Sequence, residues 1–291
     1  MDQQRSSYRL RIFIVVAFSL VLISGVALLS YWCGMKSISK PGQTQTAVSK
    51  NAADNAKSKV VSSLSATSNQ LLSVTAPIVS QTISTPVRVA GKSNFFEAHT
   101  SIRVKDANGN ILAQSFATAA GWMDKLFPFA TYVSYSKPAT ATGTVEVYEA
   151  SAQNGQDTNL ISIPVKFADI SSKDWSKFSP KFENALVNGI KQEIGAELAT
   201  NINFIIDATE CCGSTTKNKA LPQVANYLQN SGLINFSQDT EQVKKLRTGT
   251  DAQYLSKYII GISKNNYVVG YHVGLGGKVD DIFYSVSIIS Q

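Results

Sequence analysis

A long apolar run lies near the start of the chain. Residues Ile12–Met35 carry no charged side chain. As an α-helix this run would extend roughly 36 Å, whereas the hydrocarbon core of a bilayer is about 30 Å thick. Arginines cluster just before it and favour a cytoplasmic N-terminus. The pattern therefore predicts a transmembrane signal-anchor helix at residues 12–35, preceded by a cytoplasmic N-terminus at residues 1–11.

A cleaved secretory signal is the alternative interpretation of this run. Its best processing site is the small-residue sequence Gly25-Val26-Ala27. The apolar pattern continues past Ala27 to Met35, which favours an uncleaved anchor. Either interpretation exports the rest of the chain, so the polar residues 36–72 are expected to form a flexible tether outside the cytosol. A membrane-proximal helix at residues 47–72 stays open for this segment.

Short runs of alternating polar and apolar residues follow the tether. Asn108-Gly109 lies between two such runs and is a strong hairpin signal, because both residues tolerate positive φ. Pro77 and Pro86 bracket an opening strand pair. Further strand candidates are Ser101–Lys105, Ile111–Ala117, Ala130–Tyr135, Gly143–Glu149 and Leu160–Phe167. About seven strands without a helical period predict an all-β sandwich at residues 73–167.

The hydrophobic period changes after this region. Ser179-Pro180 is a helix start, with a capping residue followed by proline at the first helical position. Apolar residues then recur every four positions, which predicts one amphipathic helix of about five turns; they are Phe182, Leu186, Ile190, Ile194 and Leu198.

The remaining pattern mixes strands and helices. The expected strands are Asn203–Ala208, Tyr258–Ser263, Tyr267–Val273 and Ile282–Ile289, with a hairpin turn at Lys264-Asn265-Asn266. The expected helices are Pro222–Asn230 and Asp239–Arg247. Residues 168–291 are therefore predicted to form an α+β domain with helices packed on a mostly antiparallel sheet.

The distribution of charge along the chain is more informative about function than the net charge. The chain carries a net charge of +7, of which +6 lies in residues 1–72, +1 in residues 73–167 and none in residues 168–291. Nucleic-acid binding needs a basic face on a folded domain or a dense basic arm, so this distribution argues against it.

The cysteines are too few for a disulfide framework. Cys33 belongs to the apolar run, whereas Cys211 and Cys212 are adjacent. Two free thiols, a vicinal disulfide and a disulfide between two chains all stay open, so self-association is an open expectation.

Several residues of the first domain have a possible chemical role but are better explained by structure. Asp106-x-Asn108-x-Asn110 begins like a calcium loop, but Ile111 replaces the required glycine and Ala117 the terminal glutamate, so a hairpin turn is expected. His99 is expected to be structural. Trp122 is expected to pack in the core or at an edge, with a binding aromatic at a loop tip as the alternative.

The second domain offers equally little chemistry. Gly274–Lys278 resembles a phosphate loop only superficially, because Val279 replaces the magnesium-binding hydroxyl residue. Asp280 and Asp281 would point to opposite faces of a strand and could not act as a catalytic pair. His272 is expected to be structural. No catalytic, cofactor-binding or metal residue is assigned, and no cofactor is expected.

Four segments of the first domain also resemble a known family. In order and spacing, they are similar to the immunoglobulin-like domain of bacterial spore-germination proteins. The segments are Phe95–Ala98, Val104–Gly109, Ala117–Ala119 and Gly143–Ala152, and Ile161–Val165 looks like the family's last strand. The resemblance implies an immunoglobulin-like sandwich that acts as a non-catalytic, extracytoplasmic binding or scaffolding module. No family is recognised for residues 168–291.

Together these expectations describe a single-pass protein of the bacterial cytoplasmic membrane, with its N-terminus inside and its C-terminal domains outside. Its expected function is binding or scaffolding of an envelope protein or a cell-wall polymer, without enzymatic activity. A subunit of a transmembrane secretion or germination assembly is the alternative. An envelope-polymer-processing enzyme with its site in residues 168–291 is a weaker one.

Overall fold

The computed structural model describes residues 67–168, 171, 173–206, 210–229, 231–249 and 252–285, which belong to one compact unit, Lys57–Gln291. The predicted signal-anchor helix and most of the predicted tether lie outside the described residues. Within the described ranges, no helix is both long and apolar enough to cross a membrane.

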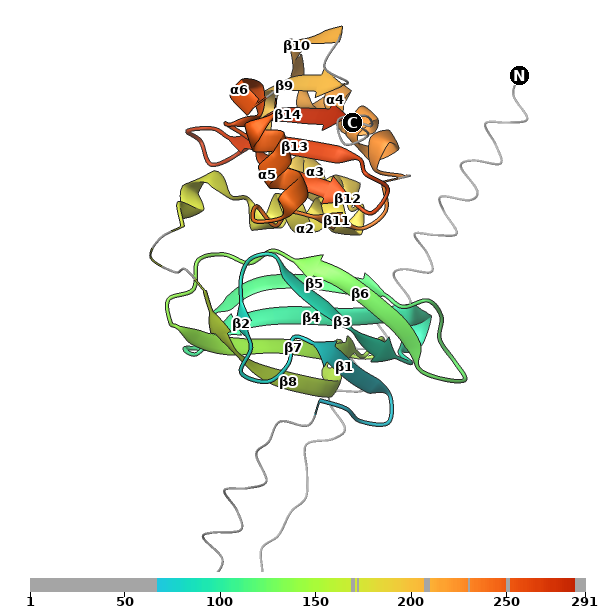
Figure 1. Ribbon diagram of the computed structural model, residues 1–291. Helices are drawn as coiled ribbons and strands as arrows, with labels where there is room; N and C mark the ends of the chain where they lie inside the picture. Colours follow the sequence, from blue (N-terminus) through green and yellow to red (C-terminus); the bar gives the residue numbers. More distant parts are fainter. Residues whose placement is uncertain are drawn as a thin grey trace, which may run out of the picture. The chain divides into compact units, whose positions relative to one another are not determined.

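The first part of the described chain is a sandwich of two β-sheets (Figure 1). One sheet has the strand order β1-β3-β6 and the other the order β2-β8-β7-β4-β5. The strands are β1 (Leu72–Ala76), β2 (Thr82–Ile83), β3 (Val87–Ser93), β4 (His99–Asp106), β5 (Ile111–Thr118), β6 (Phe127–Val133), β7 (Thr142–Ala150) and β8 (Asp157–Phe167), with the short 3-10 helix η1 (Phe96–Ala98) before β4. Between Pro77 and Pro86 lies only the two-residue β2, so the longer opening strands flank the prolines instead of lying between them.

The alternating pattern predicted the packing of the sandwich correctly. On β4, Ile102 and Val104 are fully buried, and Val104 pairs with Ala113 on one side and Val145 on the other. The β4–β5 hairpin has Gly109 at φ 85°, as the Asn-Gly signal requires. The Asp106 carboxylate accepts the backbone N–H of Asn108 at 3.0 Å and of Asn110 at 2.9 Å. The calcium-like sequence is therefore a hairpin turn.

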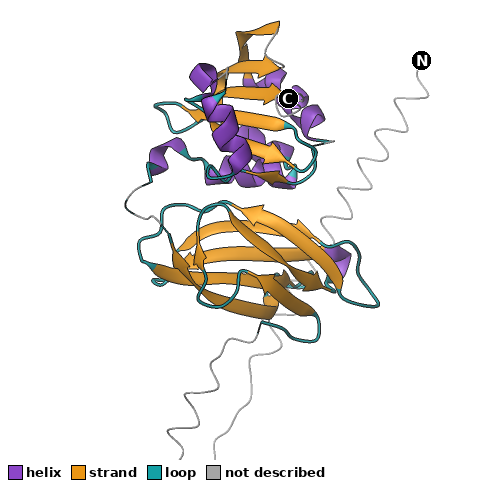
Figure 2. Ribbon diagram, in the orientation of Figure 1, coloured by secondary structure: helices purple, strands orange, loops and turns teal. Residues whose placement is uncertain are grey.

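The second part is a six-stranded sheet with the order β10-β9-β14-β13-β12-β11 (Figures 1 and 2). Its strands are β9 (Leu198–Ile206), β10 (Glu210–Thr216), β11 (Ile234–Asn235), β12 (Ile259–Ser263), β13 (Val268–Val273) and β14 (Val279–Ser285). Its helices are η2 (Trp175–Lys177), α2 (Pro180–Asn188), α3 (Lys191–Glu197), α4 (Lys217–Leu228), α5 (Glu241–Thr248) and α6 (Ala252–Leu255). Only the β9–β14 pair is parallel among the described pairs of this sheet, which confirms a mostly antiparallel α+β region.

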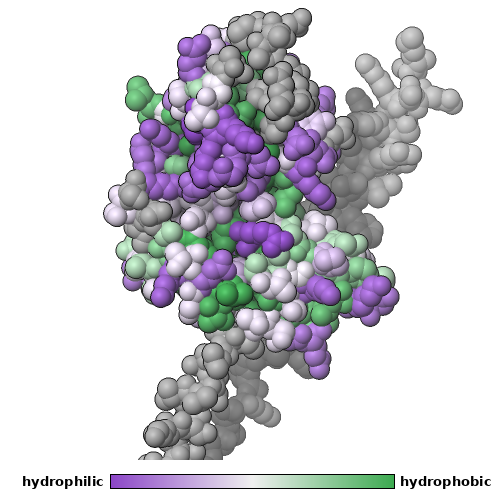
Figure 3. Space-filling model, in the orientation of Figure 1, coloured by the Kyte–Doolittle hydropathy of each residue, from purple (hydrophilic) through white to green (hydrophobic). Residues whose placement is uncertain are grey.

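Helices pack on both faces of this sheet. On β14, Ile282 and Tyr284 belong to a core shared with α2, α3 and α4, whereas Phe283 belongs to a second core shared with α5 and α6. The alternation of these three residues follows from the two-residue period of a strand. The outer side of α5 is hydrophilic in Figure 3. Lys244 and Lys245 of this helix are exposed.

Two of the predicted helices are wrong in detail. The five-turn helix is two helices, because Gly189 caps α2 at φ 67° and redirects the chain before α3. Leu198, the last residue of the predicted stripe, begins β9 instead. Helix α4 begins at Lys217, five residues before Pro222, and ends at Leu228. The pattern predicted neither β10 nor β11.

Candidate functional site

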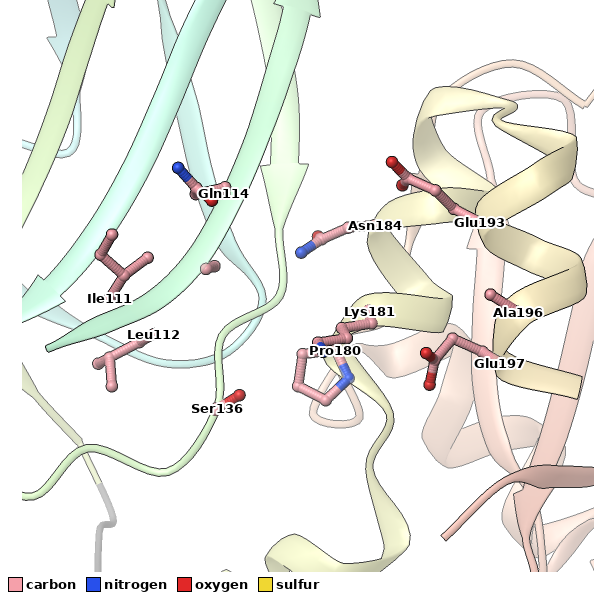
Figure 4. Close-up of a pocket in the computed structure, with 11 residues that line it drawn as sticks. Ile111, Leu112, Gln114, Ser136, Pro180, Lys181, Asn184, Glu193, Ala196 and Glu197 are labelled. Carbon is pink, nitrogen blue, oxygen red and sulfur yellow. The ribbon is translucent and has the colours of Figure 1, made fainter.

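An open groove lies beside the outer edge of the five-stranded sheet (Figure 4). Its volume is about 510 Å³. One wall is β5, and the other is formed by α2 and α3. The lining residues are Ile111, Leu112, Ala113, Gln114, Ser136, Pro180, Lys181, Asn184, Glu193, Ala196 and Glu197.

The β5 wall combines an apolar start with an edge strand. Ile111 follows the Asn-Gly turn, and its side chain is 54 % exposed. Within its sheet β5 pairs with β4 alone, so it is an edge strand. Edge strands present backbone N–H and C=O groups to an incoming chain. Two bonds reach β5 from outside its sheet: near the start of the strand Ser136 donates its N–H to the Leu112 carbonyl at 3.1 Å, and in its middle the Asn188 amide donates to the Ser115 hydroxyl at 3.0 Å.

The opposite wall is acidic. Figure 4 shows Glu193 and Glu197 projecting from α3 on the side of the groove. Lys278 directly precedes β14, and its ammonium lies 3.4 Å from the Glu197 carboxylate and 2.8 Å from the Ala196 carbonyl. Lys181 on α2 is the basic residue of the lining. This wall suits a ligand that carries positive charge or donates hydrogen bonds.

A buried polar cluster joins the residue after β6 to α2 and β13 beside the groove. The Asn184 side chain accepts the backbone N–H of Ser134 and donates to the Ser134 carbonyl, each at 2.8 Å. The neighbouring carboxylate of Glu183 accepts short hydrogen bonds from the hydroxyls of Ser134 and Tyr271. These specific bonds hold α2, which forms part of one wall of the groove, in a fixed position against the sandwich.

The Glu183 carboxyl has a raised pKa, as catalytic acids often do, but a substrate could not reach it. Burial raises its pKa to about 7, against the opposing effect of its hydrogen bonds with Ser134 and Tyr271 and of the Lys173 charge. Burial, followed by the nearby Glu183 charge, also raises the pKa of Tyr271. Glu183 is only 2 % exposed, so no substrate can reach it in this arrangement. The cluster is structural.

The acidic pair predicted to point apart lies in two different environments. Asp280 accepts from His272 Nδ1 at 2.7 Å near the β13–β14 turn. Asp281 is buried and accepts from the Tyr258 hydroxyl at 2.8 Å and the Lys257 ammonium at 2.5 Å. Hence the two carboxylates do not share one site. Gly274–Lys278 forms a tight turn, in which the Gly274 N–H donates to the Lys278 carbonyl at 2.9 Å.

The aromatic candidates of the sandwich lie away from the groove lining. His99 stacks on Phe116 with ring centroids 4.6 Å apart. Trp122 packs edge-on against Phe96 at 5.1 Å, and its side chain remains 37 % exposed. The ring contacts of His99 and Trp122 with other residues of the sandwich agree with structural roles. Trp122 also reaches the surface at a loop.

The structure does not describe the side chains of the three cysteines. Cys211 and Cys212 belong to β10, but their side chains are not among those described, and Cys33 lies outside the described residues. Among the described side chains, no group of three or more histidine, cysteine, aspartate or glutamate residues could hold a metal ion.

The sequence did not predict the groove. Its walls come from β5, α2 and α3, which are distant in the chain and whose pairing depends on the tertiary fold. Two signals were present: an apolar residue, Ile111, directly after a turn, and a hydrophilic face on the predicted helix that contains Glu193 and Glu197. Neither signal indicates which surface it would meet.

The comparison with protein families identifies the type of domain that forms the sandwich. Residues 71–156 match the family described as the immunoglobulin-like domain of bacterial spore germination. The sandwich is therefore immunoglobulin-like, and the resemblance seen in its sequence segments is confirmed. No curated protein matches the chain.

Two solved structures are similar to parts of the chain. A DUF4783 family protein from Bacteroides ovatus is 12 % identical with a TM-score of 0.28, and the match covers 38 % of this chain and 96 % of that protein. CopC from Methylosinus trichosporium OB3b is 16 % identical with a TM-score of 0.23, and that match covers 35 % and 97 %. Scores this low carry no argument about function.

Proposed function

We propose that the protein is a membrane-anchored binding protein of the bacterial envelope that holds an extended segment of a partner protein in the groove. The exposed edge strand β5 beside that groove is the observation that carries this proposal. A partner strand added to a sheet edge gains affinity from backbone hydrogen bonds and specificity from alternate side chains. The facing carboxylates of Glu193 and Glu197 favour a segment with lysine or arginine at those alternate positions.

The proposed location rests on the apolar run at residues 12–35. A helix there would hold the protein in the cytoplasmic membrane, with its N-terminus inside and its immunoglobulin-like sandwich outside. The polar residues between this run and the sandwich would serve as the tether. The proposed domain boundaries are those of the sequence analysis, with the sandwich at residues 73–167 and the α+β domain at residues 168–291.

Binding without catalysis fits the chemistry of the groove. Among the described residues, its lining holds two carboxylates, two amides, a hydroxyl and an ammonium but no cysteine or histidine. The carboxyl whose pKa lies near neutrality, Glu183, is enclosed behind the groove. The proposal therefore assigns no enzymatic activity and no cofactor, and takes an envelope protein in preference to a cell-wall polymer or nucleic acid as the ligand.

Site-specific photo-crosslinking tests the ligand and the surface together. A photoreactive phenylalanine derivative replaces Gln114, which lines the groove, or Gln253, which is exposed on α6, in the full-length chain in cells. We expect a protease-sensitive adduct at position 114 and not at position 253. The double variant E193Q/E197Q should weaken that adduct several-fold, whereas E241Q on the exposed side of α5 should not. Equal labelling at both positions would refute the groove as the binding site, and an adduct with wall polymer would change the ligand class.

A subunit of a germination or secretion assembly is the second candidate function. The observation that favours it is the match of residues 71–156 to a domain described from bacterial spore germination. Purification of the full-length protein from membranes in mild detergent would separate the two. Stoichiometric co-purification with other membrane proteins favours the assembly, and isolation as a single species favours the binding protein.

A further inference from the structure

A second surface lies at one end of the sandwich, away from the groove. The side chains of Phe96, Trp122 and Met123 are 54 %, 37 % and 75 % exposed there. Phe96 begins η1 between β3 and β4, and the other two lie in the loop between β5 and β6. Figure 2 shows η1 as the short helix at the end of the sandwich strands. We call the surface formed by these three residues the tip.

The tip is held in a fixed conformation. The Asn94 side chain accepts the Met123 N–H at 2.7 Å and donates to the Met123 carbonyl at 3.3 Å, which joins the two loops. Glu97, Ala98 and Met123 have φ values of 53°, 59° and 109°, which L-residues rarely adopt. Such conformations persist where the surroundings enforce them, and they are concentrated at binding surfaces. The apolar side chains are thus displayed by rigid loops.

The chain from the predicted anchor arrives at this same end. The Asn94 N–H donates to the Leu71 carbonyl at 2.9 Å, beside the start of β1. The Asn69 amide donates to the Asn159 carbonyl at 3.2 Å, and the Asn159 amide in turn donates to Glu149 at 2.9 Å. Glu149 also accepts the Phe96 N–H at 3.1 Å. The first described residues are therefore bonded into the tip.

The length of chain before this point limits what the tip can reach. The 31 residues from Lys36 to Ala66 separate the apolar run from the described structure. As a flexible coil they would span about 30 Å, so the sandwich would stay close to the bilayer that holds the anchor. A surface tethered at that distance meets the bilayer at a high effective concentration, and a weak contact is enough to dock it.

We propose that the tip contacts the lipid surface of the bilayer that the predicted anchor crosses, and thereby orients the sandwich on the membrane. Tryptophan prefers the membrane interface, and phenylalanine and methionine side chains gain free energy by entering the acyl boundary. The nearby cations Lys92 and Lys125 are balanced by Glu97 and Asp124, so zwitterionic lipid should serve as well as anionic lipid. This inference rests on the membrane anchor of the proposed function.

The three tryptophans of the chain allow both proposals to be tested in one sample. Trp32 lies in the apolar run, Trp122 at the tip, and Trp175 against the sandwich core near Tyr135, at the far end of β6. The full-length protein and its W32F, W122F and W175F variants are reconstituted into phosphatidylcholine vesicles with and without brominated acyl chains. Subtracting each variant from the parent protein gives the bromolipid quenching of one tryptophan, and far-UV circular dichroism checks that each variant is folded.

The outcomes separate the tip from the anchor. We expect bromolipid to quench Trp32 and Trp122 but not Trp175. Quenching of Trp32 without Trp122 overturns the tip proposal and leaves the anchor standing. No quenching of Trp32 overturns the anchor, and the tip proposal with it. If Trp122 escapes bromolipid yet is also shielded from aqueous acrylamide, a protein, such as a second copy, covers the tip and the lipid proposal is wrong.

Discussion

Glu183 shows how one buried side chain couples the fold to pH. Its carboxyl is enclosed by the hydroxyls of Ser134 and Tyr271, and burial holds its pKa at about 7 instead of 4.5. The folded protein thus retains a proton that the unfolded chain releases in this interval. The protonated carboxyl therefore makes its full contribution to the free energy of unfolding below about pH 4.5. That contribution is lost as the pH rises to about 7.

The E183Q substitution should remove this dependence. Glutamine keeps the size of the side chain and stays neutral. Relative to E183Q, the wild-type protein should lose on the order of 3 kcal/mol in its free energy of unfolding between pH 4.5 and 7. Urea unfolding at several pH values measures the difference. A parallel pH profile for the two proteins would contradict the assignment, and E241Q, on the exposed side of α5, should follow the wild type throughout.

Gly189 decides the shape of the element that carries the acidic wall. It ends α2 in the left-handed region at φ 67°, and its N–H donates to the carbonyls of Ala185 and Leu186. A glycine inside an amphipathic period lowers helix propensity only modestly, so the apolar periodicity alone predicts one continuous helix through Gly189. In the fold, the C-cap turns α3 onto a new axis and sets Glu193 and Glu197 across from β5.

Replacing Gly189 with alanine should therefore be costly without any steric clash. No atom lies within 4 Å of a Cβ built at this position, so the penalty arises from the positive φ alone. We expect G189A to lower the free energy of unfolding by about 1 kcal/mol. Thermal or urea unfolding provides the measurement. G276A is the matched control, because its Cβ also meets open space and its φ is not positive; equal effects of the two substitutions would refute the explanation.

Local signals predicted most elements, whereas contacts between distant segments determined the site. The Asn-Gly hairpin, the β12–β13 hairpin and the start of α2 at Pro180 each depend on neighbouring residues and were predicted correctly. Strand β10, with the polar sequence ECCGSTT, has no alternating pattern and is stabilised by pairing with β9. The groove could not be predicted, because the sequence of a strand does not show whether the strand will lie at the edge of its sheet.

Asn184 links the core of the sandwich to the core shared by α2, α3 and α4, which are two of the three hydrophobic cores of the described residues. Its amide satisfies both backbone groups of Ser134, which are buried. All described α-helices lie after residue 179, whereas Trp122 and Trp175 contact the sandwich. Once Trp32 is replaced in the W32F variant, tryptophan fluorescence reports on the sandwich core, whereas far-UV circular dichroism at the helical minimum reports on the α+β region.

The N184A substitution should separate the unfolding of the two cores. Removing the amide leaves a buried N–H and C=O of Ser134 unsatisfied, at a cost of about 1–3 kcal/mol. In the W32F background we expect the fluorescence and dichroism curves to coincide when Asn184 is present and to diverge in N184A. N188A, which removes one partly buried bond to Ser115 on the same helix, should leave them coincident. Coincident curves in N184A would show that the cores are coupled elsewhere.

The position of β14 has a consequence for biosynthesis. It is the last described strand in the chain, yet it lies in the middle of its sheet, parallel to β9 on one side and antiparallel to β13 on the other. Until a nascent chain has been extended through Ser285, β9 and β10 form a separate hairpin, and β9 has no neighbouring strand on its other side. During translation the sheet therefore cannot close progressively from one end. A ribosome stalled before this strand would leave two half-sheets, each with an exposed apolar edge available to chaperones and proteases.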